Sequence, residues 1–182
     1  QEAENIPMGW AYDLPTEAQW EYACRAGTQT AYYWGSSITN DQANYNQSGY
    51  AETRDVGLYD ANPWGFFDMH GNIWEWCLDW HEPFDNVEKT DPVGPATGIN
   101  RVARSGSLVN DGANQRSASR NYWIPDGRHK AHGFRIAYRQ FTTPPSNLIS
   151  IASLDFSENQ PIGTIIGAVS YTHLRAHETV DY

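Results

Sequence analysis

Two acidic residues in the stretch FDMHGNIWEW are spaced to bind a cation. Asp68 and Glu75 lie seven positions apart, with Gly71 and Asn72 between them, and this glycine–asparagine pair favours a tight turn. Such a turn can direct both carboxylates and the intervening carbonyl oxygens to one point, and calcium accepts all-oxygen ligation of irregular geometry. The sequence also allows a purely structural turn, in which Asp68 caps the backbone and Glu75 pairs with an arginine.

The chain contains two cysteines, Cys24 and Cys77. Two are too few for the disulfide framework of a small secreted domain, and spacing alone does not decide whether they form one bridge. Both stand inside aromatic motifs, so we expect buried structural thiols rather than reactive ones.

Charge and composition narrow the class of protein. The 182 residues carry a formal net charge of −10, which argues against nucleic acid as a partner because phosphates require a basic surface. No run of about 18 apolar residues is present, so we expect no membrane-spanning segment. Aromatic residues reach 14% and charged residues 19%, a balance that suits a fold with little regular structure and many loop contacts.

One segment predicts a helix clearly. In the stretch 14–28, Thr16 and Gln19 fit a capping box, and Gly27 marks the end of the helix. The fold class is therefore expected to be α+β with much irregular structure. The other expected elements are strands at 101–108 and 133–139, with loops at 32–62 and 83–100.

Seven motifs follow one another along the chain: LPTEAQWEYACRAGT, YYWG, NPWGFFDMHGNIWEWCLDW, DPVGP, RVARSGS, RSASR and GFR. In this order they resemble the sulfatase-modifying factor, or formylglycine-generating enzyme, family. The resemblance covers about residues 9–139 and implies a calcium-stabilised, loop-rich relative of the C-type lectin fold. It also implies that residues 1–141 form a domain that lacks its N-terminal part.

The resemblance implies calcium ligands in the turn already described. Asp68 and Glu75 match side-chain ligands of the family, and Gly71 and Ile73 match carbonyl ligands. The family's second calcium loop is not matched, because residues 44–56 lack its pattern. We therefore expect calcium as the cofactor.

The resemblance also locates the positions where family members do chemistry. Formylglycine generators oxidise a cysteine of a sulfatase with two copper-binding cysteines, and a soft Cu(I) ion prefers thiolates. The matching positions here are about Asn110 and Gln115, so we expect no copper and no catalytic residue. By the same resemblance, Asp111, Asn114 and Arg116 are expected to line a ligand groove.

A second enzymatic branch of the family forms sulfoxides, with iron held by three histidines from a separate N-terminal helical domain. His129 and His132 are three positions apart in the sequence HKAH but have no evident third partner. This branch stays an alternative, because an upstream domain could supply the metal.

The end of the chain changes character. Residues 142–147, TTPPSN, have the composition of a linker. Residues 148–168 resemble the first, incomplete β-sandwich strands of a cadherin-like repeat, in which Glu158 matches a calcium ligand. Residues 169–182 form a tail, of which 169–179 back-translate into a common sequencing adapter, so the tail is left out of functional reasoning. Adhesion-type repeats imply an extracellular or cell-surface location.

The sequence therefore predicts a non-catalytic, calcium-stabilised binding or structural module of a secreted or surface multidomain protein, with a protein or a glycan as ligand. The alternative is an enzyme of the same family. It would be either a formylglycine-generating oxidoreductase or a sulfoxide synthase whose iron-binding domain lies elsewhere.

Overall fold

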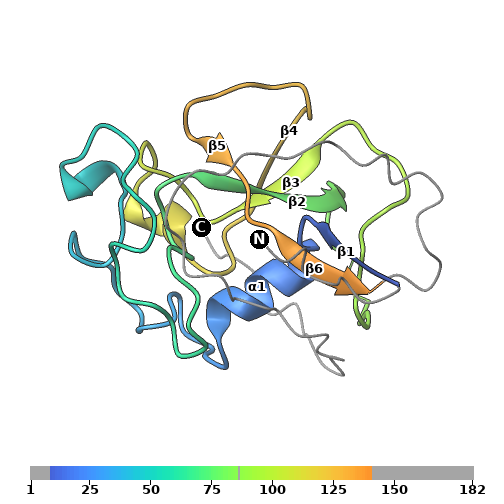
Figure 1. Cartoon of the computed structure of the whole chain (residues 1–182), viewed down its shortest axis with the longest axis horizontal. Helices are drawn as coiled ribbons and strands as arrows, with labels where there is room; N and C mark the ends of the chain where they lie inside the picture. Colours follow the sequence, from blue (N-terminus) through green and yellow to red (C-terminus); the bar gives the residue numbers. More distant parts are fainter. Residues whose placement is uncertain (1–8, 86, 141–182) are drawn as a thin grey trace, which may run out of the picture.

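A computed structural model describes residues 9–85 and 87–140 of the protein (Figure 1). The predicted linker, the cadherin-like segment with Glu158 and the tail lie outside these residues. Within them, the chain is mostly loop, with short strands and few helices. The elements in chain order are β1 (Trp10–Asp13), α1 (Glu17–Arg25), η1 (Asn46–Ser48), β2 (Trp74–Trp80), β3 (Arg101–Arg104), η2 (Gly112–Gln115), β4 (Asn121–Trp123), β5 (His132–Gly133) and β6 (Ala137–Gln140).

Helix α1 begins and ends where the local sequence predicts. Thr16 Oγ1 accepts a hydrogen bond from Gln19 N at 3.2 Å, and Gln19 Oε1 accepts one from Thr16 N at 2.9 Å. These two bonds complete the capping box. At the other end, Ala26 (φ 46°) and Gly27 (φ 88°) adopt left-handed conformations that stop the helix. The predicted helix is confirmed.

The strands form two small sheets. The larger sheet has the order β4-β3-β2-β5 and packs on α1 through β2 and β3 (Figure 1). Strand β5 runs parallel to β2, whereas the other neighbours are antiparallel. Strands β1 and β6 form a separate antiparallel pair, which brings together the two ends of the described chain. No helix in the described ranges is long and apolar enough to cross a membrane.

The prediction of one strand over 133–139 is wrong, because this segment contributes to two strands in different sheets. Gly133 pairs with Glu75 in the larger sheet, whereas β6 pairs with β1. The chain leaves the first sheet at Arg135, whose guanidinium binds the Glu75 carboxylate. The segment is thus divided between the two sheets, and Arg135 lies between its two strands.

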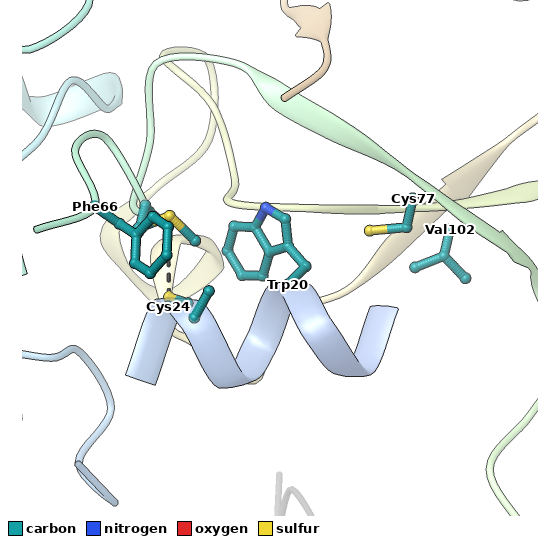
Figure 2. Packing of buried hydrophobic residues seen from close by; sticks show 7 residues of the cluster. Trp20, Cys24, Phe66, Cys77 and Val102 are labelled. Atoms are coloured by element: carbon teal, nitrogen blue, oxygen red, sulfur yellow. Dashed lines mark hydrogen bonds between the residues drawn. The ribbon is translucent and has the colours of Figure 1, made fainter. Parts of the chain in front are cut away.

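Trp20 forms the centre of the core between α1 and the larger sheet. Its side chain is 1% exposed and stands between Cys24 and Phe66 on one side and Cys77 and Val102 on the other (Figure 2). Both cysteines are buried and free. The open question of a disulfide is therefore answered, because the two thiols lie on opposite sides of the indole.

A buried arginine joins strand β3 to helix α1. The Arg104 side chain is fully buried and bonds to Glu17 Oε1 at 3.0 Å and to Glu21 Oε2 at 2.5 Å. Its Nη2 also donates to the Ser117 carbonyl at 2.6 Å. Because a buried charge that loses its partner is costly, these bonds hold the loop around η2 against α1.

Candidate functional site

Asp68 holds the loop on which the calcium prediction rests. Its backbone is left-handed, with φ 55°, and its Oδ2 accepts a hydrogen bond from Gly57 N at 2.6 Å. Burial raises the pKa of Asp68; the Gly57 bond and the Arg135 charge act in the opposite direction, while the charge of Glu75 raises the pKa further. The two carboxylates are thus close enough to repel each other.

The second carboxylate, Glu75, already has a cationic partner. Arg135 Nε donates to Glu75 Oε2 at 2.6 Å and Arg135 Nη2 donates to Oε1 at 2.7 Å, a bidentate geometry that is among the stronger ion pairs. Trp20 Nε1 adds a third bond to Oε2 at 2.6 Å. The Gly71 carbonyl accepts bonds from Ser105 Oγ at 3.0 Å and from Ile73 N at 2.9 Å.

These contacts match the structural alternative that the sequence left open, with Asp68 capping a loop and Glu75 paired with an arginine. In the described residues, no group of three or more His, Cys, Asp or Glu side chains could hold a metal ion. A calcium ion in this turn would rely on backbone oxygens beside the two carboxylates, and these donor types suit calcium. Since Glu75 is engaged by Arg135, the ion must share this carboxylate with the guanidinium. Calcium stays a prediction.

The two positions that are expected to match the family's cysteines, Asn110 and Gln115, hold a loop together. Gln115 is fully buried, and its Nε2 donates to the carbonyl oxygens of Ser107 at 3.1 Å, Asn110 at 3.3 Å and Asp111 at 3.0 Å. Asn110 Oδ1 accepts bonds from Ser107 Oγ at 2.7 Å and from Trp74 Nε1 at 2.8 Å. Both amides therefore serve as internal hydrogen-bonding groups of the segment 107–115.

The three residues expected to line a groove make bonds within their own loop. Asp111 caps η2, with Oδ1 accepting from Asn114 N at 3.3 Å and from Asn114 Nδ2 at 2.7 Å. Arg116 Nε donates to the Ala113 carbonyl at 2.9 Å. The structure thus gives Asp111, Asn114 and Arg116 local roles, and their contact with a ligand stays a prediction.

The two thiols are poorly suited to redox chemistry. Burial raises the pKa of Cys24 to about 12 and raises the pKa of Cys77 well above its usual range. The thiolate is the reactive form of cysteine, so both side chains remain protonated at neutral pH. The expectation of buried structural thiols is confirmed.

A buried histidine that sequence reasoning missed connects the η2 loop to the segment 32–34. His70 Nδ1 donates to the Gln115 carbonyl at 2.6 Å, and its ring stacks on Tyr33 at 5.2 Å and meets Trp34 edge-on at 4.7 Å. Burial lowers the pKa of His70 to about 4, so the ring is neutral at physiological pH. Nothing in the local spacing of His70 pointed to these partners.

Aromatic rings from three strands gather at the surface next to Asn110. Trp123 lies 6.2 Å from Trp76 and 4.1 Å from His132, measured between ring centroids, and all three are partly exposed. Trp74 continues the row inward, 5.5 Å from Trp123. We call Trp74, Trp76, Trp123 and His132 the aromatic strip. Alternate residues of a strand share a face, so the pair Trp74 and Trp76 was the signal available in the sequence.

The aromatic strip also contains an unsatisfied polar atom. Among the described residues, His132 Nδ1 is a buried side-chain nitrogen without a hydrogen-bond partner. Such atoms are rare in folded proteins. Because this nitrogen is buried, the strip offers its ring surface, and not this atom, to a partner.

Comparison with known proteins shows which family the chain belongs to. The sulfatase-modifying factor enzyme 1-like domain matches residues 2–140. The chain is 38% identical to the formylglycine-generating enzyme of Streptomyces coelicolor over 68% of the chain and 46% of that enzyme. It is 40% identical to the serine/threonine-protein kinase pkn1 of Chlamydia caviae over 68% of the chain and 20% of that protein. The chain thus spans less than half of either relative.

Solved structures have the same fold. Treponema denticola variable protein 1 superposes with a TM-score of 0.64 at 32% identity, covering 71% of this chain and 48% of that one. PvdO from Pseudomonas aeruginosa superposes with a TM-score of 0.60 at 26% identity, covering 71% and 53%. The expected resemblance is confirmed over the domain, and the chain belongs to the sulfatase-modifying factor enzyme 1-like family.

Proposed function

We propose that this domain is a non-catalytic binding module of its family and that the aromatic strip is its recognition surface. The proposal rests on the pair of amides at the positions that are expected to match the family's cysteines. Asn110 and Gln115 supply hydrogen bonds that hold the loop, and neither amide can replace a thiolate as a ligand of Cu(I). The cysteines that the chain does have are buried and protonated.

The aromatic strip suits recognition better than catalysis. Tryptophan is enriched among the residues that dominate the free energy of binding, and partly exposed rings offer large contact areas at low entropic cost. Tyr122, next to Trp123 in β4, points to the opposite face of the sheet and stacks there on His81 at 3.8 Å, so the proposed recognition surface is the aromatic strip itself. A protein or a glycan is the ligand class we propose, at an extracellular or cell-surface location.

We further propose calcium binding in the turn from Asp68 to Glu75. The support is that one atom, Arg135 Nη2, donates both to the Asp68 carbonyl at 3.4 Å and to Glu75 Oε1 at 2.7 Å, which places oxygen atoms of the two residues near one point. Calcium bound by these residues would stabilise the loop that ends in β2. An enzyme of the same family, with its metal supplied from elsewhere, is the alternative function.

A Cu(I) titration tests the non-catalytic proposal at the loop itself. The full chain competes with a chromophoric chelator for Cu(I). We expect the wild-type chain to remove no Cu(I) from the chelator. The double variant Asn110→Cys/Gln115→Cys is the matched comparison, because it restores thiols at the family positions. Tight binding of one Cu(I) ion by the wild-type chain would contradict the proposal, whereas binding gained only by the folded double variant would support it.

A further inference from the structure

A pocket separate from the aromatic strip lies among the loops that follow helix α1. Its volume is about 480 Å³, within the range of about 300–1,000 Å³ that is typical of small-molecule sites. Three chain segments line it, at 33–34, 41–42 and 60–63. The lining residues that matter for its chemistry are Tyr33, Trp34, Asp41, Gln42, Asp60 and Pro63.

The walls of this pocket are fixed by bonds outside it. The Tyr33 hydroxyl donates to the Asp60 carbonyl at 2.5 Å, which joins the first wall to the third. Asn62 Nδ2 anchors the third wall to the end of α1 by donating to the Ala23 carbonyl at 2.6 Å. Trp34 Nε1 donates to the Ser37 carbonyl at 2.7 Å. The pocket is therefore largely preformed, which lowers the entropic cost of binding.

The second wall is held in the same way. The Gln42 side-chain oxygen accepts bonds from Thr39 N at 2.8 Å and from Thr39 Oγ1 at 2.9 Å. The Thr39 hydroxyl also lies within hydrogen-bonding distance of Asp41 Oδ1, so its single proton is shared between the two acceptors. This arrangement fixes the Asp41 carboxylate next to the aromatic wall without supplying a positive charge to it.

The charge of the pocket selects the sign of its ligand. Asp41 and Asp60 contribute two carboxylates, and none of the lining residues is Lys, Arg or His. Burial, aided by the charge of Asp60, raises the pKa of Tyr33 to about 12, so its phenol stays neutral. An anion would be repelled, and a bare metal ion would find too few oxygen ligands beside the rings.

We infer that this pocket binds an organic ammonium group carried on apolar carbon. Tyr32 stacks on one face of Trp34 and His70 on one face of Tyr33, so the cation would meet the other face of each ring. The two carboxylates would supply the opposite charge, and Pro63 would pack against the carbon body. The same chemistry can come from a free quaternary amine or from the side chain of a lysine. This site is separate from the aromatic strip, and it is linked to the loop of Gln115 through His70, which stacks on Tyr33 and donates to the Gln115 carbonyl.

The test is an NMR titration of the full chain with two ammonium probes at low ionic strength. Tetramethylammonium represents the quaternary amine and n-butylammonium represents the lysine side chain, and the tighter of the two identifies the source. We expect saturable binding with an upfield shift of the probe methyl signals, since they would lie against aromatic faces. 1-Butanol, which has the same carbon chain without the charge, should bind far more weakly.

Matched variants locate the site. Asp60→Asn and Asp41→Asn remove charge from exposed side chains and should each weaken n-butylammonium binding about threefold to fivefold. Asp126→Asn, an equally exposed acid outside the pocket, should leave binding unchanged. The inference is overturned if neither ammonium probe saturates, if 1-butanol binds as tightly as n-butylammonium, or if Asp126→Asn weakens binding as much as the pocket variants.

Discussion

Asp79 is a buried carboxylate whose proton affinity depends on folding. Its Oδ2 accepts a hydrogen bond from Glu17 N at 2.7 Å at the start of α1, yet burial raises the pKa of Asp79 to about 6 from its usual 3.8. Between these two values the folded protein holds a proton that the unfolded chain has released. The contribution of Asp79 to stability is therefore greatest at low pH and is lost as the pH rises towards 6.

Asp79→Asn should remove this pH dependence. At about pH 7.5 the variant should be more stable than the wild type by about 1–2 kcal/mol, because it no longer buries a charge. Near pH 4 the two proteins should melt at nearly the same temperature. Thermal unfolding at both pH values measures the difference, and an equal gain at both values would show that Asp79 is not the group responsible.

Asp68 decides whether calcium stabilises the domain. If the ion binds between Asp68 and Glu75, calcium should raise the Tm relative to a chelator, and Asp68→Ala should abolish this rise. For each protein, the Tm with chelator is subtracted from the Tm with calcium. This is needed because Asp68→Ala also loses the bond to Gly57, which changes the Tm even without calcium. Asp126→Ala, in an exposed loop, controls for net charge. A calcium-dependent rise that survives in Asp68→Ala would place the ion elsewhere.

At the scale of the elements, the loop that contains η2 depends on a close contact between Gly106 and the residues Asn114 and Gln115. This contact leaves no room for a side chain at position 106. Gly106 has φ 74°, and a Cβ built on it would overlap Gln115 Oε1 and lie 2.5 Å from the Asn114 carbonyl oxygen. The loop that carries Asn110 thus depends on a bare Cα at this position. Gly49 has a similar φ of 86° but open space around it.

Gly106→Ala should destabilise the domain by about 2–4 kcal/mol, since it adds both backbone strain and a steric clash. Gly49→Ala, which adds the strain alone, should cost about 1 kcal/mol. Urea unfolding of the two variants gives the comparison. Equal losses in the free energy of unfolding would mean that the loop adjusts to a Cβ at position 106. The contact of Gly106 with Gln115 would then not determine the conformation of the loop.

The elements that the sequence predicted well are those whose causes are local. Helix α1 follows from Thr16 and Gln19, three residues apart, and the loop-rich character follows from composition. The ion pair of Glu75 with Arg135 joins residues 60 positions apart. The sequence could therefore predict that Glu75 pairs with an arginine, but not which arginine. The same distance in sequence hid the parallel pairing of β5 with β2 and therefore the division of the segment 133–139.

The candidate site was predicted in part for the same reason. The resemblance indicated Asn110 and Gln115 as the positions of the family's cysteines, and this stays a prediction. The burial of Gln115 and its three carbonyl partners depend on how the loop folds. The aromatic strip was missed because Trp123 and His132 come from strands far from Trp76 in sequence. The structure divides the tryptophans of the motif GNIWEWCLDW between core and surface, with Trp74 buried and Trp76 and Trp80 partly exposed.

For the whole molecule, this division of tryptophans predicts two classes of variant. Trp20→Ala empties the centre of the core and should cost about 3–5 kcal/mol, whereas Trp123→Ala removes a partly exposed ring and should cost about 1 kcal/mol. Chemical denaturation measures both. A loss at Trp123 as large as that at Trp20 would assign the aromatic strip to the core and would remove it as a recognition surface.

The central claim is that this member of the family does not carry out the family's oxidation. The most direct measurement is mass spectrometry of a cysteine-containing sulfatase peptide after incubation with the full chain, Cu(I) and oxygen. The formylglycine-generating enzyme of Streptomyces coelicolor serves as the positive control. Our account predicts that the peptide keeps its cysteine with this chain and loses it with the control. Conversion of the cysteine to the aldehyde by this chain would contradict it.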